Sequence, residues 1–132
     1  MESKKYFIFN KGEKFKLSDN FSSHELECKC SRADCIEQKI SVNLIEKLQK
    51  IREKLGKSLK ITSGYRCEAH NKAIGGAAKS QHILGNAADL KTEDMDSLEA
   101  LVEVEFDAVG NAKPSFLHVD VRDTKNKLRW TY

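Results

Sequence analysis

A chain of 132 residues, 33% of them charged and 39% apolar, has the length and balance of one ordinary globular domain. The net charge of +3 is mild, and no nucleic-acid-binding signature accompanies the basic stretch Lys125–Arg129, so we interpret that stretch as solvated surface. No apolar run is long enough to span a membrane. We therefore expect a single domain over residues 1–132, a monomer, with no nucleic-acid partner.

Hydrophobic periodicity predicts the elements in chain order. The clearest helix is Ser41–Leu55, where apolar residues from Leu44 to Leu55 form one stripe, with Ser41 as N-cap and Gly56 just after the end. The other expected helices are Arg66–Ile74 and one from a Thr92 cap through Val102. The expected strands are Tyr6–Phe9, Leu59–Ser63, Asn86–Leu90, Phe106–Gly110, Phe116–Val121 and Arg129–Tyr132. This order predicts an α+β fold, with helices packed on a small antiparallel sheet.

Two candidate metal ligands, His82 and Asp89, stand seven positions apart with Gly85 between them. Along a helix this spacing is about 10 Å, too far to share one ion, whereas a turn at Gly85 and a following strand can fold Asp89 back beside His82. Imidazole and carboxylate ligands suit zinc, and His118 is the best candidate for a third ligand. Three protein ligands leave one position for water, so the sequence predicts a catalytic Zn²⁺ site.

Three ordered segments also carry a family resemblance. They are Ile61-Thr62-Ser63-Gly64-Tyr65-Arg66 with Asn71 and Gly75-Gly76, then Ser80-x-His82-x-x-Gly85-x-Ala87-x-Asp89, then Phe116-x-His118-x-Asp120-x-Arg122. Together they resemble the zinc D-Ala-D-Ala peptidase family, which cuts peptidoglycan peptides and is related in fold to lysostaphin-type endopeptidases and the hedgehog domain. The resemblance runs from about Phe21 to Arg122.

The resemblance implies roles for several residues. Arg66 would point into the cleft, where its guanidinium can bind a substrate carboxylate or support a developing oxyanion; we expect its loss to affect activity and not folding. Ser80 and Gln81 either bind substrate or close the turn. Asp120 shares a strand face with His118, and we take it as the general base. The alternative makes Asp120 an anchor that hydrogen-bonds a ligand histidine or Arg122.

The implied function is hydrolysis of D-amino-acid-containing bonds in peptidoglycan, by a D-Ala-D-Ala carboxypeptidase or a cross-link or stem-peptide endopeptidase. The alternative is a catalytically inactive module of the same fold that binds cell wall or protein. Arg66 and the acidic residue near His118 favour the enzyme. Ser115 counts the other way, because it stands where relatives have a glutamate base three positions before the third ligand.

The apolar run Tyr6–Phe9 is too short for a signal peptide. We therefore expect synthesis in the cytoplasm, and the resemblance suggests that a phage lysis system or a virion delivers the protein to the wall.

Four cysteines form a separate cluster in the sequence. Cys28, Cys30 and Cys35 crowd one short stretch, and Cys67 follows Arg66. A Cys28–Cys30 bridge would close a tiny strained ring. Reduced thiols, a second, structural zinc, and disulfides all stay open, and we expect Cys67 to lie close to the other three.

Overall fold

The computed structural model describes residues 4–132, and the stripe predicted for Ser41–Leu55 forms its longest helix, α2 (Val42–Leu55). Ser41 Oγ accepts a hydrogen bond from the backbone N–H of Leu44 at 3.2 Å, which caps the helix. Gly56 ends it in the left-handed conformation, with a φ of 67°. The stripe from Leu44 to Ile51 lies in the hydrophobic core.

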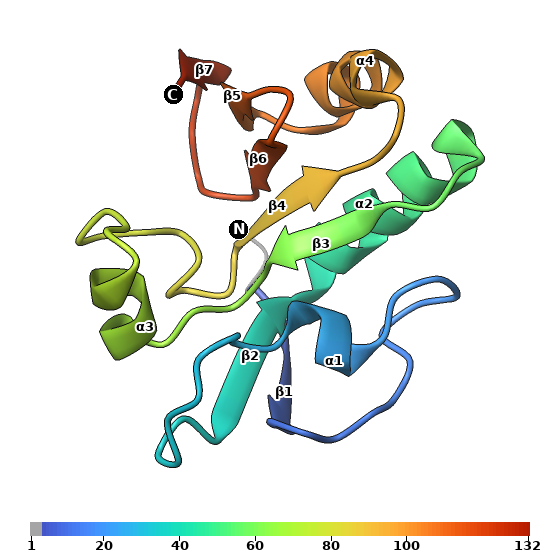
Figure 1. Ribbon diagram of the computed structural model, residues 1–132. Helices are drawn as coiled ribbons and strands as arrows, with labels where there is room; N and C mark the ends of the chain where they lie inside the picture. The colour runs from blue at the N-terminus through green and yellow to red at the C-terminus, as the bar shows by residue number, and fades with distance from the viewer. Residues whose placement is uncertain (1–3) are drawn as a thin grey trace.

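A five-stranded sheet with the order β3-β4-β6-β5-β7 lies beside this helix (Figure 1). Its strands are β3 (Lys60–Ser63), β4 (Ala87–Lys91), β5 (Ala108–Ala112), β6 (Phe116–Asp120) and β7 (Leu128–Thr131). Neighbouring strands are antiparallel except for β5 and β7, which are parallel. The expected α+β class is therefore confirmed, although the sheet is mixed at the β7 edge.

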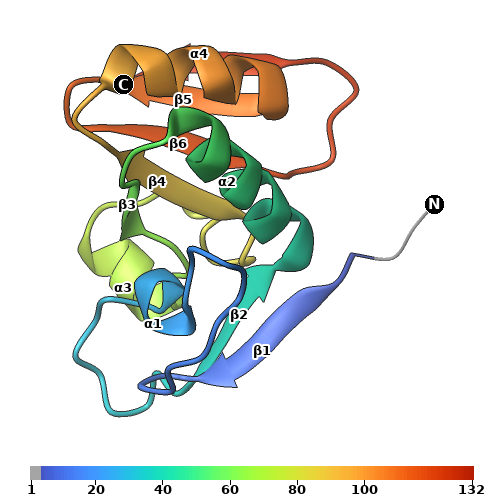
Figure 2. The same ribbon diagram turned by 90° about the vertical axis from the view of Figure 1, so that its right-hand side faces the viewer.

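The two faces of this sheet have different chemistry because side chains alternate along each strand. Leu90 of β4 and Leu117 and Val119 of β6 belong to the core, together with residues of α2 and α4 (Met95–Glu105). Figure 2 shows α2 and α4 side by side along the sheet. The intervening residues, Asp89 and His118 among them, point to the other face. The apolar face therefore builds the core and leaves the polar face to form a site.

A smaller two-stranded sheet precedes α2. It pairs β1 (Tyr6–Asn10) with β2 (Glu37–Ser41), and β2 runs directly into the helix. Two short helices, α1 (Ser23–Leu26) and α3 (Glu68–Ala73), lie outside the sheets. Strand β2 was not among the elements expected from sequence. Between residues 4 and 132, no helix combines the length and the apolarity that crossing a membrane requires.

Both limits expected for one helix, a cap at Thr92 and a last residue at Val102, were wrong, because α4 begins after Asp94 and continues to Glu105. Helix α4 is capped by Asp94, whose carboxylate accepts from the backbone N–H of Ser97 at 3.1 Å. Thr92 instead donates its hydroxyl to the Ser58 carbonyl at 2.8 Å, which ties the start of the loop before α4 to the loop between α2 and β3. The first three residues of the N-terminal segment considered for a signal peptide lie outside the described chain.

Candidate metal centre

One row of directly paired residues crosses all five strands of the larger sheet. Ser63 pairs with Asp89, Asp89 with His118, His118 with Gly110, and Gly110 with Trp130. Paired residues on adjacent strands point to the same face. The register of the sheet therefore places Asp89 and His118 side by side, although they are far apart in the sequence.

The turn before β4 adds His82 to this row. Gly85 adopts a φ of 77° there, and a Cβ at this position would lie 2.7 Å from the Lys39 carbonyl oxygen, so the turn requires glycine. His82 is buried, and its Nδ1 donates to the carbonyl oxygen of Gly64 at 2.7 Å. Gly64 lies so close to α1 that a Cβ would come within 2.6 Å of the Leu26 carbonyl oxygen. Glycine at both positions thus lets the backbone fix the His82 ring.

The hydrogen bonds decide which imidazole nitrogens are free to bind a metal. A carbonyl can only accept, so His82 Nδ1 carries the hydrogen and neutral His82 keeps the lone pair on Nε2. In the same way, His118 Nε2 faces the Asp120 carboxylate at 2.7 Å, which leaves the lone pair on Nδ1. These two free nitrogens lie 3.3 Å and 3.0 Å from the same oxygen of Asp89, Oδ1.

Lone pairs of His82 Nε2, His118 Nδ1 and Asp89 Oδ1 therefore face one another at a single buried site. Ligand atoms of His82, Asp89 and His118 lie within 4.8 Å of one another, and all three residues are buried. Burial opposes the charged form of His118, but the carboxylates of Asp120 and Asp89 outweigh it and raise its pKa. Burial likewise disfavours ionised Asp89, yet the two neighbouring imidazoles hold its pKa far below its usual range. The cluster thus favours positive charge at its centre, and two imidazoles with a carboxylate fit zinc.

Arg66 lies beside these residues with its guanidinium held by three partners. It donates to Ser63 Oγ at 2.9 Å, to Asn71 Oδ1 at 3.2 Å and to Asp89 Oδ2 at 3.1 Å. Its side chain is only 13% exposed. Because this side chain is largely buried and makes three hydrogen bonds, we expect it to contribute to folding as well, while its role in activity stays a prediction.

Asp120 is surrounded by donors on both oxygens. Oδ2 accepts from His118 Nε2 and Arg122 Nη2, each at 2.7 Å, and Oδ1 accepts from Arg122 Nε at 2.8 Å and from the Arg122 backbone N–H at 3.1 Å. Four donors match the four lone-pair positions of a carboxylate. Burial alone would raise the pKa of Asp120, but the bonds from Arg122 and His118 lower it to about 2. These contacts favour the anchor alternative over a general base.

A pocket of about 440 Å³ opens onto the candidate ligands. Its wall includes Trp130, whose ring centroid lies 5.3 Å from that of His118, and Tyr132. A Cβ on Gly110 would collide with the Trp130 indole, so glycine in the row makes room for this ring. The sequence pattern predicts an edge strand for the C-terminal residues but does not predict this wall. The pairing of Gly110 with Trp130 is a long-range feature that no local pattern reveals.

Ser80 and Gln81, the expected substrate-binding residues, line the same pocket. Ser80 Oγ accepts from the His82 backbone N–H at 3.2 Å, and Gln81 Oε1 accepts from Asn86 Nδ2 at 3.2 Å. Both residues thus close the turn while facing the pocket, and their binding of substrate stays a prediction. Among the described residues that line this pocket, Asp89 is the one that carries a carboxylate.

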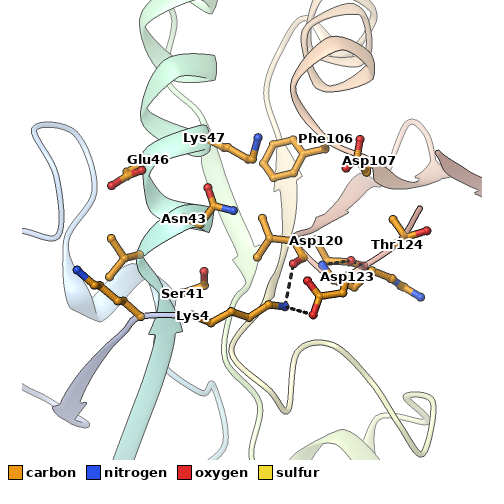
Figure 3. A pocket seen from close by; sticks show the side chains of 14 residues that line it. Lys4, Ser41, Asn43, Glu46, Lys47, Phe106, Asp107, Asp120, Asp123 and Thr124 are labelled. Atoms are coloured by element: carbon orange, nitrogen blue, oxygen red, sulfur yellow. Dashed lines mark hydrogen bonds and ion pairs between the residues drawn. The ribbon is translucent and has the colours of Figure 1, made fainter. Parts of the chain in front are cut away.

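A larger hollow, of about 770 Å³, lies elsewhere, between Lys4, the start of α2 and Asp123 (Figure 3). Lys4 Nζ reaches the Val121 carbonyl at 3.2 Å and the Asp123 carboxylate at 3.6 Å across it. Asp120 lines this hollow, but His82, Asp89 and His118 do not. The smaller pocket is therefore the one that the three candidate metal ligands line.

The cysteines form a second cluster. Cys67 Sγ lies 3.8 Å from Cys28 Sγ and 3.9 Å from Cys30 Sγ, so the expected closeness of Cys67 to the other three is confirmed. All four sulfurs, including that of Cys35, lie within 4.8 Å of one another.

Comparison with known proteins adds one finding. A family model described as Peptidase M15 matches residues 19–120. The matched range contains every candidate ligand, Arg66 and the four cysteines, and it ends before β7. No curated protein matches the chain.

Proposed function

The chain belongs to the peptidase M15 family, and from that premise we propose that it is a zinc metallopeptidase which hydrolyses D-amino-acid-containing peptide bonds in peptidoglycan. The observation that carries the proposal is the convergence of His82 Nε2, His118 Nδ1 and Asp89 Oδ1 at an open pocket. The family supports peptidase chemistry, and the donor set supports the metal.

His82, Asp89 and His118 would hold the ion. A zinc ion bound there would supply a Lewis acid for a peptide carbonyl. The protein would contribute fixed ligands, since Gly64 orients His82 and Asp120 orients His118 through the nitrogen that does not face the metal.

The charge of the pocket suits an anionic peptide. Among the described residues, Arg66, Lys79 and Arg122 line it, whereas the one acidic side chain is that of the candidate ligand Asp89. One N–H of Arg66 donates to Asp89. A guanidinium has five N–H donors, so Arg66 retains others that can bind a substrate carboxylate or an oxyanion. This excess of cations favours a substrate with a free carboxylate near the scissile bond, as a D-Ala-D-Ala carboxypeptidase requires.

We assign Asp120 to positioning. A carboxylate whose lone pairs are all engaged, with a pKa of about 2, is poorly suited to take a proton near neutral pH. As an anchor it keeps the hydrogen of His118 on Nε2, and Arg122 holds it in place.

The second candidate function is a binding module that keeps the fold and the metal but does not hydrolyse. It is favoured by one observation, that no carboxylate other than Asp89 is found among the described residues lining the pocket. The enzyme would take a peptidoglycan peptide as partner, and the module would bind cell wall or a protein. Both also retain, as part of the proposal, a monomer made in the cytoplasm and carried to the wall by a phage lysis system or a virion.

A digest of purified peptidoglycan, analysed by mass spectrometry, separates the two functions. We expect zinc-loaded protein to produce stem peptides that have gained water and lost a residue or a cross-link, and chelator or His82→Ala to abolish them. Binding of zinc-loaded protein to the wall without any such product would establish the module instead.

A further inference from the structure

We propose that Cys28, Cys30, Cys35 and Cys67 bind a second, structural zinc ion, separate from the centre formed by the two histidines and Asp89. The first observation is the spacing of the sulfurs. A tetrahedral zinc with Zn–S bonds of about 2.3 Å separates its sulfurs by about 3.8 Å. The Cys28–Cys67 and Cys30–Cys67 sulfur separations are 3.8 Å and 3.9 Å.

The second observation is that each sulfur has one nitrogen donor of its own. The Cys67 backbone N–H donates to Cys28 Sγ at 3.4 Å, and the His70 backbone N–H to Cys67 Sγ at 3.4 Å. Gln38 Nε2 donates to Cys35 Sγ at 3.4 Å, and Lys11 Nζ to Cys30 Sγ at 3.3 Å. Such donors stabilise thiolates, and outer hydrogen bonds of this kind are typical of metal sites.

The donors are themselves built into the fold. Gln38 is fully buried on β2, and its Oε1 accepts from the Cys28 backbone N–H at 2.7 Å while its Nε2 serves Cys35. Lys11 also donates to the Cys30 carbonyl, and its charge offsets part of the net −2 that four thiolates leave on zinc. A buried amide that serves two cysteines fits a site formed by all four residues better than one disulfide with two spare thiols.

The place of Cys67 gives the site a structural purpose. Cys67 caps α3 and directly follows Arg66, while Cys28, Cys30 and Cys35 belong to the loop between α1 and β2. A metal on all four sulfurs would fasten that loop to the segment whose Gly64 and Arg66 contact His82 and Asp89. It would stabilise a loop, residues 27–36, that contributes no residue to the hydrophobic core cluster.

Zinc content in a set of variants tests this inference independently of the catalytic proposal. We expect two zinc ions per chain in the wild type and one in His82→Ala/His118→Ala, with the exposed His24→Ala as control at two. In the His82→Ala/His118→Ala background, Cys30→Ser should lose the remaining zinc, and Cys30→His, which restores a ligand, should keep it. Cobalt in that background should show intense sulfur-to-metal charge-transfer absorption.

A measurement on the unaltered protein covers the case in which cysteine variants fail to fold. Titration of the native wild type with a mercurial should release zinc in step with thiol modification, while the histidine-bound ion stays. Zinc-free His82→Ala/His118→Ala protein that is folded and has four freely titrating thiols would overturn the proposal. So would a native mass lowered by the two hydrogens of a disulfide, or iron at the cysteines.

Discussion

Asp120→Asn separates the two roles considered for this residue. The amide keeps the shape but presents two donor hydrogens where the carboxylate offered lone pairs. Asp120 accepts from His118 on one oxygen and from Arg122 on both. An asparagine oxygen can serve only one of these partners well, and the NH₂ group then faces another donor. His118 would be free to move its hydrogen to Nδ1, the nitrogen that zinc needs.

The expected magnitude follows from the role of this carboxylate as a partner of a ligand histidine. Loss of such a partner costs about 10- to 100-fold in metal affinity, which is about 1.4 to 2.8 kcal/mol at 1.4 kcal/mol per factor of ten. We expect Asp120→Asn to weaken zinc at the histidine site by that factor, measured by competition with a chromophoric chelator. Turnover at saturating zinc should then stay within about tenfold of the wild type, well short of the loss that removal of a general base brings.

The control is Asp123→Asn, a nearby carboxylate whose side chain is 90% exposed. It should change neither zinc affinity nor turnover. A loss of about 100-fold or more in turnover at saturating zinc, with zinc affinity unchanged, is what a general base would give. That result would refute the positioning role.

Three further outcomes are expected. Arg66→Ala should lower both turnover and melting temperature, because a hydrogen bond to a charged group, such as that to Asp89, is worth about 1.5–3 kcal/mol. The fall in melting temperature should be larger without zinc, and an unchanged melting temperature in both states would contradict the buried pair. Gly110→Ala should displace the Trp130 indole, shift its fluorescence and reduce turnover while zinc content stays constant; unchanged fluorescence would show that the indole does not depend on the missing Cβ. Ser41→Ala should destabilise the fold by about 1 kcal/mol in denaturant unfolding, and no change would mean that the cap at Leu44 is replaced by solvent.

Local patterns were enough for much of the fold. The stripe from Leu44 to Ile51 and its caps defined α2 to within one residue, because periodicity and caps act within a few residues of one another. Strand β2 (Glu37–Ser41) escaped notice because its sequence, Glu-Gln-Lys-Ile-Ser, is mostly polar. It is a strand because its partner β1 and the adjoining α2 hold it, which is tertiary context overriding propensity.

The candidate site, like the fold, could be predicted from the sequence only in part. Motif spacing predicted that His82, Asp89 and His118 share one metal site. The register of β4 and β6 places Asp89 and His118 opposite one another. The contact of Asp120 with Arg122 was only one of two alternatives from sequence, because whether Arg122 reaches both carboxylate oxygens depends on how the chain bends after β6. The sequence did not reveal the Trp130 wall, since a parallel pairing of β7 with β5 has no local signature.

The most direct test of the zinc peptidase account is a zinc titration of metal-depleted protein, with hydrolysis of a peptide ending in D-Ala-D-Ala followed at each step. We predict no release of D-Ala at the start, and activity that rises in proportion to zinc bound at His82, Asp89 and His118, with His118→Ala inactive throughout. Full zinc occupancy of that site without hydrolysis of this peptide or of peptidoglycan would contradict it, and so would activity that does not depend on zinc.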